Sequence, residues 1–225
     1  IRKLTGNSDP YKSVKDRFNQ FALKLLPDLQ KKVRASSNPF ETACRLAIAG
    51  NIIDYGVNTE LDKSTVLDTI DQAMTVKIFG DMEAFQHAAN SAKKILYLGD
   101  NTGEIVFDRL LIEQLSPDRV TYAVRGGPVL NDATMADAED TGMTDMVRVI
   151  DNGTDAPGTF LSICSDTFMK YYNDADLVIS KGQGNYEALS EVDKNIFFLF
   201  KAKCHIAAMD AGCELGDIVV LKRGS

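Results

Sequence analysis

The chain has 225 residues, of which 44% are hydrophobic and 25% are charged, and its formal net charge is -7. An acidic chain lacks the extended basic surface that binds nucleic-acid backbones, so we expect no nucleic-acid partner. The sequence contains no apolar run approaching the roughly 18 residues that cross a bilayer, and we expect no membrane partner.

Four cysteines are scattered along the chain without forming closely spaced pairs: Cys44, Cys164, Cys204 and Cys213. This usage is typical of reduced thiols in a cytoplasmic protein, and it argues against a structural zinc site. The sequence begins at Ile1 in a polar segment, and we expect that the natural amino terminus is not included.

Residues 1–92 have a largely helical pattern. Asp9 and Pro10 are a cap-and-proline start signal, after which apolar residues recur every three or four positions. Pro27 is expected to break or kink this first helix. Further helices are predicted to begin at Pro39, Lys63 and Met82, the last two ending near Ile78 and Ala92. We therefore expect an all-helical amino-terminal subdomain.

Residues 93–225 alternate between short apolar runs and helical stretches. The runs, which we expect to be strands, are residues 95–98, 120–124, 147–150, 177–179, 196–200 and 218–221. The helical stretches are residues 105–115, 133–140, 160–172 and 203–211. Continuous apolar strands separated by helices predict an α/β domain, in which a Rossmann-like, mostly parallel sheet carries helices on both faces.

The first predicted strand, residues 95–98, is followed by the turn sequence GDNTGE. Asp100 and Asn101 supply hard oxygen donors of the kind that Mg²⁺ and Mn²⁺ prefer, and the flanking glycines let the backbone turn sharply. The same two residues could instead form an Asx-turn that caps the helix beginning near Glu104. Taken alone, this loop leaves both interpretations open.

A second polar loop follows the next predicted strand and contains Asp132. If the two strands are neighbours in a parallel sheet, Asp132 can face Asp100 and Asn101 across one edge of that sheet. Two acids and an amide would then bind a cation and leave positions open for water and phosphate oxygens. Alternatively, Asp132 is simply an acid in the first turn of a helix.

Two lysines also follow predicted strands. Lys181 lies in a glycine-containing loop with Gly182, where a ligand could approach the backbone. Lys201 follows the strand at residues 196–200, where an ammonium group could balance a phosphate. Each lysine taken singly is more often a solvated surface group. Two lysines at the same sheet edge as the acids, taken together, favour phosphate binding.

Three further polar residues have two readings each. Glu104 is either an acid that supports the metal ligands or a first-turn glutamate stabilised by its helix dipole. Asn51 and Asp54 are polar within an otherwise apolar helix. They either face a substrate cleft or form a buried hydrogen-bonded pair.

The order of these motifs resembles that of the damage-control phosphatase family, also known as domain of unknown function 89. The matching segments are GNIID, GDNTGE, GGPVLNDAT, SKGQGNYE and FLFKAKC, which span most of the chain. The chain looks most similar to the compact prokaryotic and archaeal branch. That branch usually carries a cysteine-containing segment before the first helix, which this sequence lacks.

The resemblance implies a metal site and a phosphate contact. The family's cation ligands map onto Asp100, Asn101 and Asp132, with Mn²⁺, Mg²⁺, Co²⁺ or Ni²⁺ as the expected ion. Its phosphate-contacting lysine maps onto Lys201, and Lys181 lies in a loop that varies between branches.

The leading hypothesis is therefore a metal-dependent phosphatase acting on small phosphomonoesters, such as sugar phosphates or damaged phosphometabolites. Two alternatives stay open. The first is an S-adenosylmethionine-dependent carboxyl methyltransferase, because the strand and loop at residues 94–103 superficially resemble the start of that class. The second is a non-catalytic module that binds phosphometabolites. The expected partner is a small phosphorylated molecule that serves as the substrate.

Overall fold

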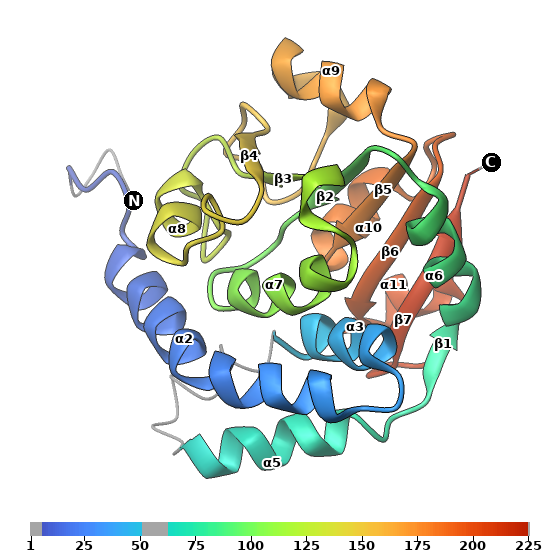
Figure 1. Cartoon of the computed structure of the whole chain (residues 1–225). Coiled ribbons are helices and arrows are strands. Elements are labelled where there is room, and N and C mark those ends of the chain that lie inside the picture. The colour runs from blue at the N-terminus through green and yellow to red at the C-terminus, as the bar shows by residue number, and fades with distance from the viewer. Residues whose placement is uncertain (1–5, 51–62, 225) are drawn as a thin grey trace.

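One seven-stranded sheet organises residues 6–50 and 63–224, which are the residues that the computed structural model describes (Figure 1). Its strands are β1 (Ile78–Gly80), β2 (Ile95–Leu98), β3 (Val120–Val124), β4 (Arg148–Asp151), β5 (Leu177–Lys181), β6 (Ile196–Lys201) and β7 (Ile218–Arg223). The strand order is β1-β7-β6-β5-β2-β3-β4. All neighbouring strands are parallel except β6 and β7.

The chain winds outward from β2 in both directions. It first passes from β2 to β3 and β4, and then returns to β5 and β6 on the other side of β2. The strand order therefore reverses beside β2. In open α/β sheets, ligands bind at the carboxyl ends of the strands where such a reversal occurs.

Helices cover both faces of the sheet because successive strand residues point to opposite sides. One core includes Ile95 and Tyr97, and the other includes Leu96 and Leu98. The first face carries α2 (Lys12–Ala35), α3 (Pro39–Ala49), α5 (Lys63–Ala73), α6 (Met82–Ser91), α7 (Glu104–Gln114) and α8 (Met135–Asp140). The second carries α9 (Asp166–Asp174), α10 (Gln183–Leu189) and α11 (His205–Ala211). The predicted fold class is thus confirmed.

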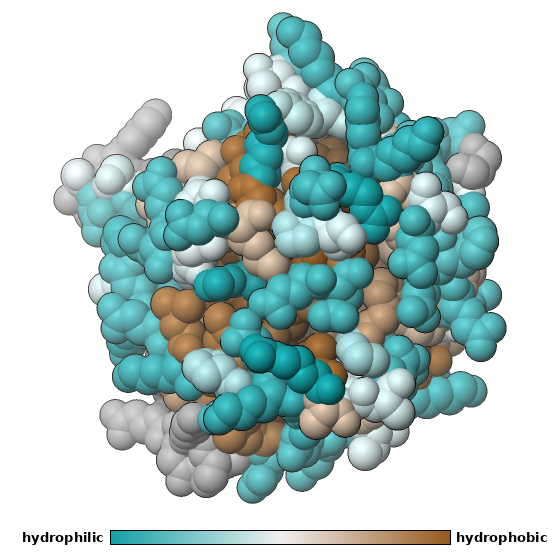
Figure 2. Space-filling view, viewed as in Figure 1, coloured by the Kyte–Doolittle hydropathy of each residue, from teal (hydrophilic) through white to brown (hydrophobic). Residues whose placement is uncertain are grey.

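The surface follows the same division between apolar interior and polar exterior. On the face shown in Figure 2, hydrophilic side chains predominate, and hydrophobic ones are visible mainly between them. Every helix among residues 6–50 and 63–224 is too short or too polar to cross a membrane.

The prediction that residues 1–92 are all helical is wrong at β1. Residues 78–80, expected at the end of a helix, form an edge strand parallel to β7. Three residues are too few to show the alternation that marks a strand, and the partner strand lies far along the chain. Gly80 has a φ of +115°, and a Cβ there would overlap the carbonyl of Val220, so glycine permits this pairing. The short helix α10 was also not predicted.

The sequence-based predictions for the start of α3 and for the effect of Pro27 on α2 have different outcomes. Helix α3 begins at Pro39 as predicted, and the Asn38 side chain caps it by accepting a hydrogen bond from the amide of Glu41. Pro27 does not end α2. The helix is 24 residues long and continues beyond the proline to Ala35. Leu25, Leu26 and Leu29 are buried on both sides of the proline. Their packing offsets the hydrogen bond that the proline cannot donate.

Helix α2 is tied directly to the loop that follows β2. The amide of Gly103 donates to the side-chain oxygen of Asn19 at 2.8 Å, and the side-chain nitrogen of Asn19 donates to Asp137 at 3.0 Å. Lys15 pairs with the same Asp137 at 2.8 Å. The amino-terminal helices therefore help to fix the position of this loop.

We predict that Asn19→Ala lowers the free energy of unfolding by about 1–3 kcal/mol, because it leaves the buried Gly103 amide without its acceptor. Urea unfolding followed by circular dichroism measures this change. The matched control is Asn90→Ala at an exposed position of α6, which should change stability by less than about 0.5 kcal/mol. Equal stability of the two variants would contradict the tethering role of Asn19.

Candidate active site

The loops after β2 and β3 lie side by side at the carboxyl edge of the sheet. Asn101 and Asp132 form an isolated antiparallel bridge between the two loops. The amide of Ala133 donates to the carbonyl of Asp100 at 2.8 Å, and the amide of Thr102 donates to the carbonyl of Asn131 at 2.8 Å. The structure thus brings together the three residues that the sequence singled out.

The three side chains share an enclosed, negatively charged environment. Asn101 and Asp132 are 8% and 6% exposed, and the Asn101 side chain donates to Asp100 at 3.0 Å. Burial raises the pKa of Asp100 well above its usual value, and the neighbouring carboxylates of Glu104 and Asp132 raise it further. Burial also raises the pKa of Asp132, which Arg125 opposes. Negative charge is therefore costly here without a balancing cation.

These donors fit a hard divalent cation. They offer only oxygen ligands, from two carboxylates and one carboxamide, which suit Mg²⁺ and Mn²⁺ better than zinc. Among the described residues, no group of three or more His, Cys, Asp or Glu side chains is arranged to hold a metal ion. Any cation bound here would thus depend on Asn101 and on water or substrate oxygens for the rest of its ligands.

Arg125, the first residue after β3, is a site residue that sequence reasoning missed. Its Nε donates to Asp132 at 2.6 Å, and its Nη1 donates to Thr159 and Asn185 at 3.0 Å each. The side chain is only 3% exposed. An arginine next to a predicted strand end was the available signal, but its sequence neighbours do not reveal its burial.

Lys181 has different partners from those predicted. Its ammonium group is fully buried and donates to Glu104 and Asp108 at 2.6 Å each, and to the carbonyl of Ala47 at 2.9 Å. These three acceptors occupy its donors, so Lys181 neutralises protein carboxylates instead of offering a free ammonium group to a substrate. Glu104 accordingly forms a buried ion pair beside the acids, in addition to starting α7.

Asp108, one helical turn after Glu104, completes this buried network. The hydroxyls of Tyr97 and Tyr122 donate to its two oxygens at 2.8 and 2.7 Å. Asp108 therefore accepts hydrogen bonds from a lysine and two tyrosines, and all four groups lie within the core. Sequence reasoning did not single out this aspartate, because the residues around it in α7 are buried almost throughout and do not mark one polar face.

Two lysines of the FLFKAKC segment occupy different positions relative to the acids. Lys201 is the exposed last residue of β6. The charge of Lys203, two residues later, lowers the pKa of both Asp100 and Glu104, against the larger effect of burial. Of these two lysines, Lys203 is thus the one whose charge acts on the acids, whereas a phosphate contact by Lys201 stays a prediction.

Gly182 is placed against Asp100. It has a φ of +81°, and a Cβ at this position would overlap the Asp100 carboxylate. The close approach of the loop after β5 thus requires glycine. The other predicted substrate contacts, Asn51 and Asp54, lie outside the described residues.

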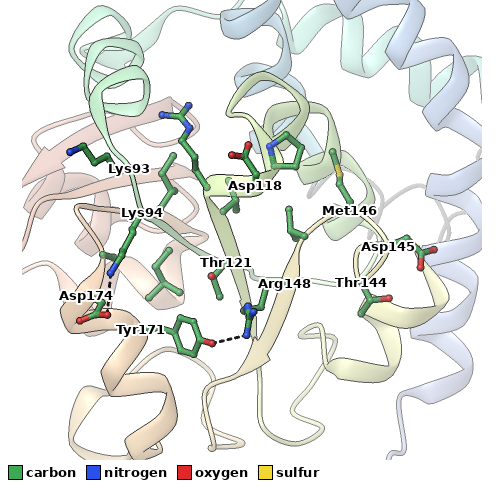
Figure 3. Close-up of a pocket in the computed structure, with 17 residues that line it drawn as sticks. Lys93, Lys94, Asp118, Thr121, Thr144, Asp145, Met146, Arg148, Tyr171 and Asp174 are labelled. Atoms are coloured by element: carbon green, nitrogen blue, oxygen red, sulfur yellow. Dashed lines mark hydrogen bonds and ion pairs between the residues drawn. The ribbon is translucent and has the colours of Figure 1, made fainter.

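A groove of about 710 Å³ lies at the opposite edge of the sheet, near the amino ends of β2, β3 and β4 (Figure 3). Its charged side chains include Lys94, which pairs with Asp174 at 3.3 Å, and Arg148, which donates to the hydroxyl of Tyr171 at 3.1 Å. These groups are exposed or half-buried and satisfy one another. We therefore place the candidate active site at Asp100, Asn101 and Asp132, which do not line this groove.

The sequence matches the damage-control phosphatase ARMT1-like domain over residues 1–219. The chain belongs to this family. The family resemblance predicted from the sequence motifs is therefore confirmed.

Relatives of this damage-control phosphatase family member occur among archaea. A damage-control phosphatase of Pyrococcus horikoshii is 36% identical, with 99% of this chain and 77% of that protein covered. One of Archaeoglobus fulgidus is 35% identical, covering 97% and 77%. The crystal structure of a Pyrococcus horikoshii protein of the family superposes with a TM-score of 0.89 at 34% identity, covering 98% of this chain and 78% of that one.

We predict that Lys181→Met destabilises the protein by about 3–5 kcal/mol, because it leaves the buried carboxylates of Glu104 and Asp108 without their cation. Denaturant unfolding of the purified variant measures the loss. Lys94→Met is the control, since the exposed pair of Lys94 with Asp174 should contribute no more than about 1 kcal/mol. Similar stabilities of the two variants would argue against a structural role for the buried lysine.

A second prediction concerns the contact between Gly182 and Asp100. Gly182→Ala should displace the Asp100 carboxylate and reduce metal affinity by about 10- to 100-fold, as typically follows disruption of groups that orient ligands. Gly216→Ala is the control, because Gly216 also has a positive φ, +96°, but open space around it. Isothermal titration with Mn²⁺ compares the two. Equal affinities would show that backbone strain alone explains any effect of Gly182→Ala.

Proposed function

We propose that this protein is a metal-dependent phosphatase that hydrolyses small phosphomonoesters, with sugar phosphates or damaged phosphometabolites as candidate substrates. The observation that carries the proposal is the meeting of Asp100, Asn101 and Asp132 at adjacent strand ends, beside the reversal of strand order. Relatives at 35–36% identity that are named damage-control phosphatases support it.

In this proposal, Asp100, Asn101 and Asp132 hold Mn²⁺, Mg²⁺, Co²⁺ or Ni²⁺. Such an ion, when bound, polarises a phosphoryl oxygen and lowers the pKa of water. Phosphoryl transfer depends mainly on positioning and on electrostatic stabilisation of the transferred group. Lys203 supplies positive charge close to Asp100, and we assign it to the phosphate oxygens together with the predicted contact from Lys201.

The protein frame around the acids suits this role. Arg125 fixes the orientation of Asp132, and Gly182 lets the loop after β5 close against Asp100. Enclosure reduces screening by water, so charges at this edge act on a bound phosphate more strongly than they would on an open surface. Lys181 holds Glu104 as a carboxylate partner and keeps it from approaching the substrate as a free acid.

The methyltransferase alternative finds less support in the geometry of the first loop. The amides of Thr102 and Gly103 already donate to Asn131 and Asn19, respectively. A glycine loop that receives a nucleoside must leave backbone space and donors for it. We therefore favour phosphate chemistry. A non-catalytic binding module would share the same residues and differ only in releasing no phosphate.

We predict metal-dependent phosphate release from at least one member of a panel of sugar phosphates and related phosphomonoesters. Asp100→Asn should reduce kcat/KM by more than about 100-fold, because it removes a ligand charge and not merely a group that orients a ligand. Release of inorganic phosphate in the presence of Mn²⁺, Mg²⁺, Co²⁺ or Ni²⁺ measures the activity.

Asp118→Asn is the matched control, since Asp118 is an exposed acid in the turn before β3, at the opposite edge of the sheet. It should retain the wild-type rate. Turnover that survives EDTA, or full activity of Asp100→Asn, would refute the proposed role of the metal. Binding of phosphomonoesters without phosphate release would favour the non-catalytic module.

A further inference from the structure

Arg125 contains a buried donor without a hydrogen-bond partner among residues 6–50 and 63–224. Within these residues its Nη2 makes no hydrogen bond, although the nitrogen is shielded from solvent. The nearest stated charge partner is Oδ1 of Asp100, at 3.7 Å, which is longer than a hydrogen bond. Leaving a charged donor unsatisfied in the interior is costly, so such groups commonly mark a functional arrangement.

The other donors of this side chain fix the direction in which Nη2 points. Nε is bound to Asp132, and Nη1 is shared between Thr159 and Asn185. Because a guanidinium group is planar and rigid, these contacts determine the position of the remaining nitrogen. Nη2 is thus held towards Asp100 by Asp132 of the ligand set and by Thr159 and Asn185, which lie outside it.

Asn185 is in turn fixed by the ends of two further strands. Its side-chain nitrogen donates to the carbonyl of Gly99 at 3.2 Å and to the carbonyl of Lys181 at 2.8 Å. Its oxygen accepts from Arg125 and also from Thr159, the latter at 2.9 Å. The guanidinium group is therefore connected to the ends of β2, β3 and β5 and to the loop after β4. This framework is much more rigid than a surface ion pair.

We propose that Arg125 is a positioning residue that bridges the carboxylates of Asp100 and Asp132 and holds them at one spacing for a divalent cation. Nε binds Oδ2 of Asp132 at 2.6 Å, and Nη2 faces Oδ1 of Asp100 at 3.7 Å. Oδ1 of Asp132 and Oδ2 of Asp100 then remain for the cation, and the latter oxygen also accepts a hydrogen bond from Asn101, the third proposed ligand, at 3.0 Å. This inference rests on the metal site of the proposed function.

Charge and geometry make opposite predictions for the removal of Arg125. If the arginine only balances charge, its loss makes the net charge of the site more negative, and a divalent cation binds more tightly. If it positions the carboxylates, its loss lets them separate under mutual repulsion, and the cation binds less tightly. A lysine keeps the charge but cannot reproduce the planar fork. Lysine and methionine variants together therefore distinguish the two roles.

The test is titration of the purified wild type, Arg125→Lys and Arg125→Met with Mn²⁺ alone, with free Mn²⁺ followed by electron paramagnetic resonance. The positioning role predicts that both variants bind Mn²⁺ about 10- to 100-fold more weakly than the wild type. Arg119 is the matched control. Its guanidinium donates to the carbonyls of Ala92 and Leu115, at the opposite sheet edge. Arg119→Lys and Arg119→Met should keep the wild-type affinity.

Wild-type affinity in Arg125→Lys, or tighter binding in Arg125→Met, would overturn the inference. Failure of the wild type itself to bind Mn²⁺ would instead overturn the metal site on which it rests. Thermal unfolding without metal reports whether each variant folds. If both Arg125 variants are unfolded, Thr159→Val carries the test, because it removes one acceptor that orients the guanidinium. It should weaken Mn²⁺ binding by about 2- to 10-fold, and unchanged affinity would overturn the inference.

Discussion

The buried ammonium group of Lys181 is the interaction on which the arrangement of this protein most depends. It joins β5 to Glu104 and Asp108 of α7 and to the backbone of α3 through Ala47. Burial alone would lower the pKa of Lys181, but the carboxylates of Asp108 and Glu104 raise it above its usual value. The lysine therefore stays charged in the core. Such a pair adds little net stability compared with apolar packing, but it specifies one arrangement of its elements.

The charge balance around this lysine extends to the neighbouring strand ends. Lys181 and Arg125 are the buried cations of the cluster, and Asp100, Asp132, Glu104 and Asp108 are its carboxylates. The carboxylates thus outnumber the buried cations, and the neighbouring Glu104 raises the pKa of Asp100 beyond the effect of burial. A divalent cation would restore the balance. The deficit of positive charge therefore lies at the same point of the sheet where the strand order reverses.

How far the sequence revealed this site depends on which forces place each residue. The long strands were predicted because buried parallel strands are continuous apolar runs, and their pairing then brings Asp100 and Asp132 together. The role of Lys181 was mistaken, because a lysine that follows an apolar run looks solvent-exposed. Its partners lie one helical turn apart on α7, and nothing in their spacing distinguishes a buried acid from an exposed one. Strand β1 was not predicted, because only its pairing with β7 defines these residues as a strand.

The two edges of the sheet differ in how their charged groups are held. The charged groups of the groove at the amino edge are accessible to water, and Lys94 pairs there with Asp174, so their fields are screened. The acids at the carboxyl edge are enclosed and share a hydrogen-bonded frame, in which Nη2 of Arg125 has no hydrogen-bond partner among the described residues. A phosphate and its cation gain most where fixed charges are already oriented and desolvated. Buried polar contacts thus identify the candidate active edge of this fold.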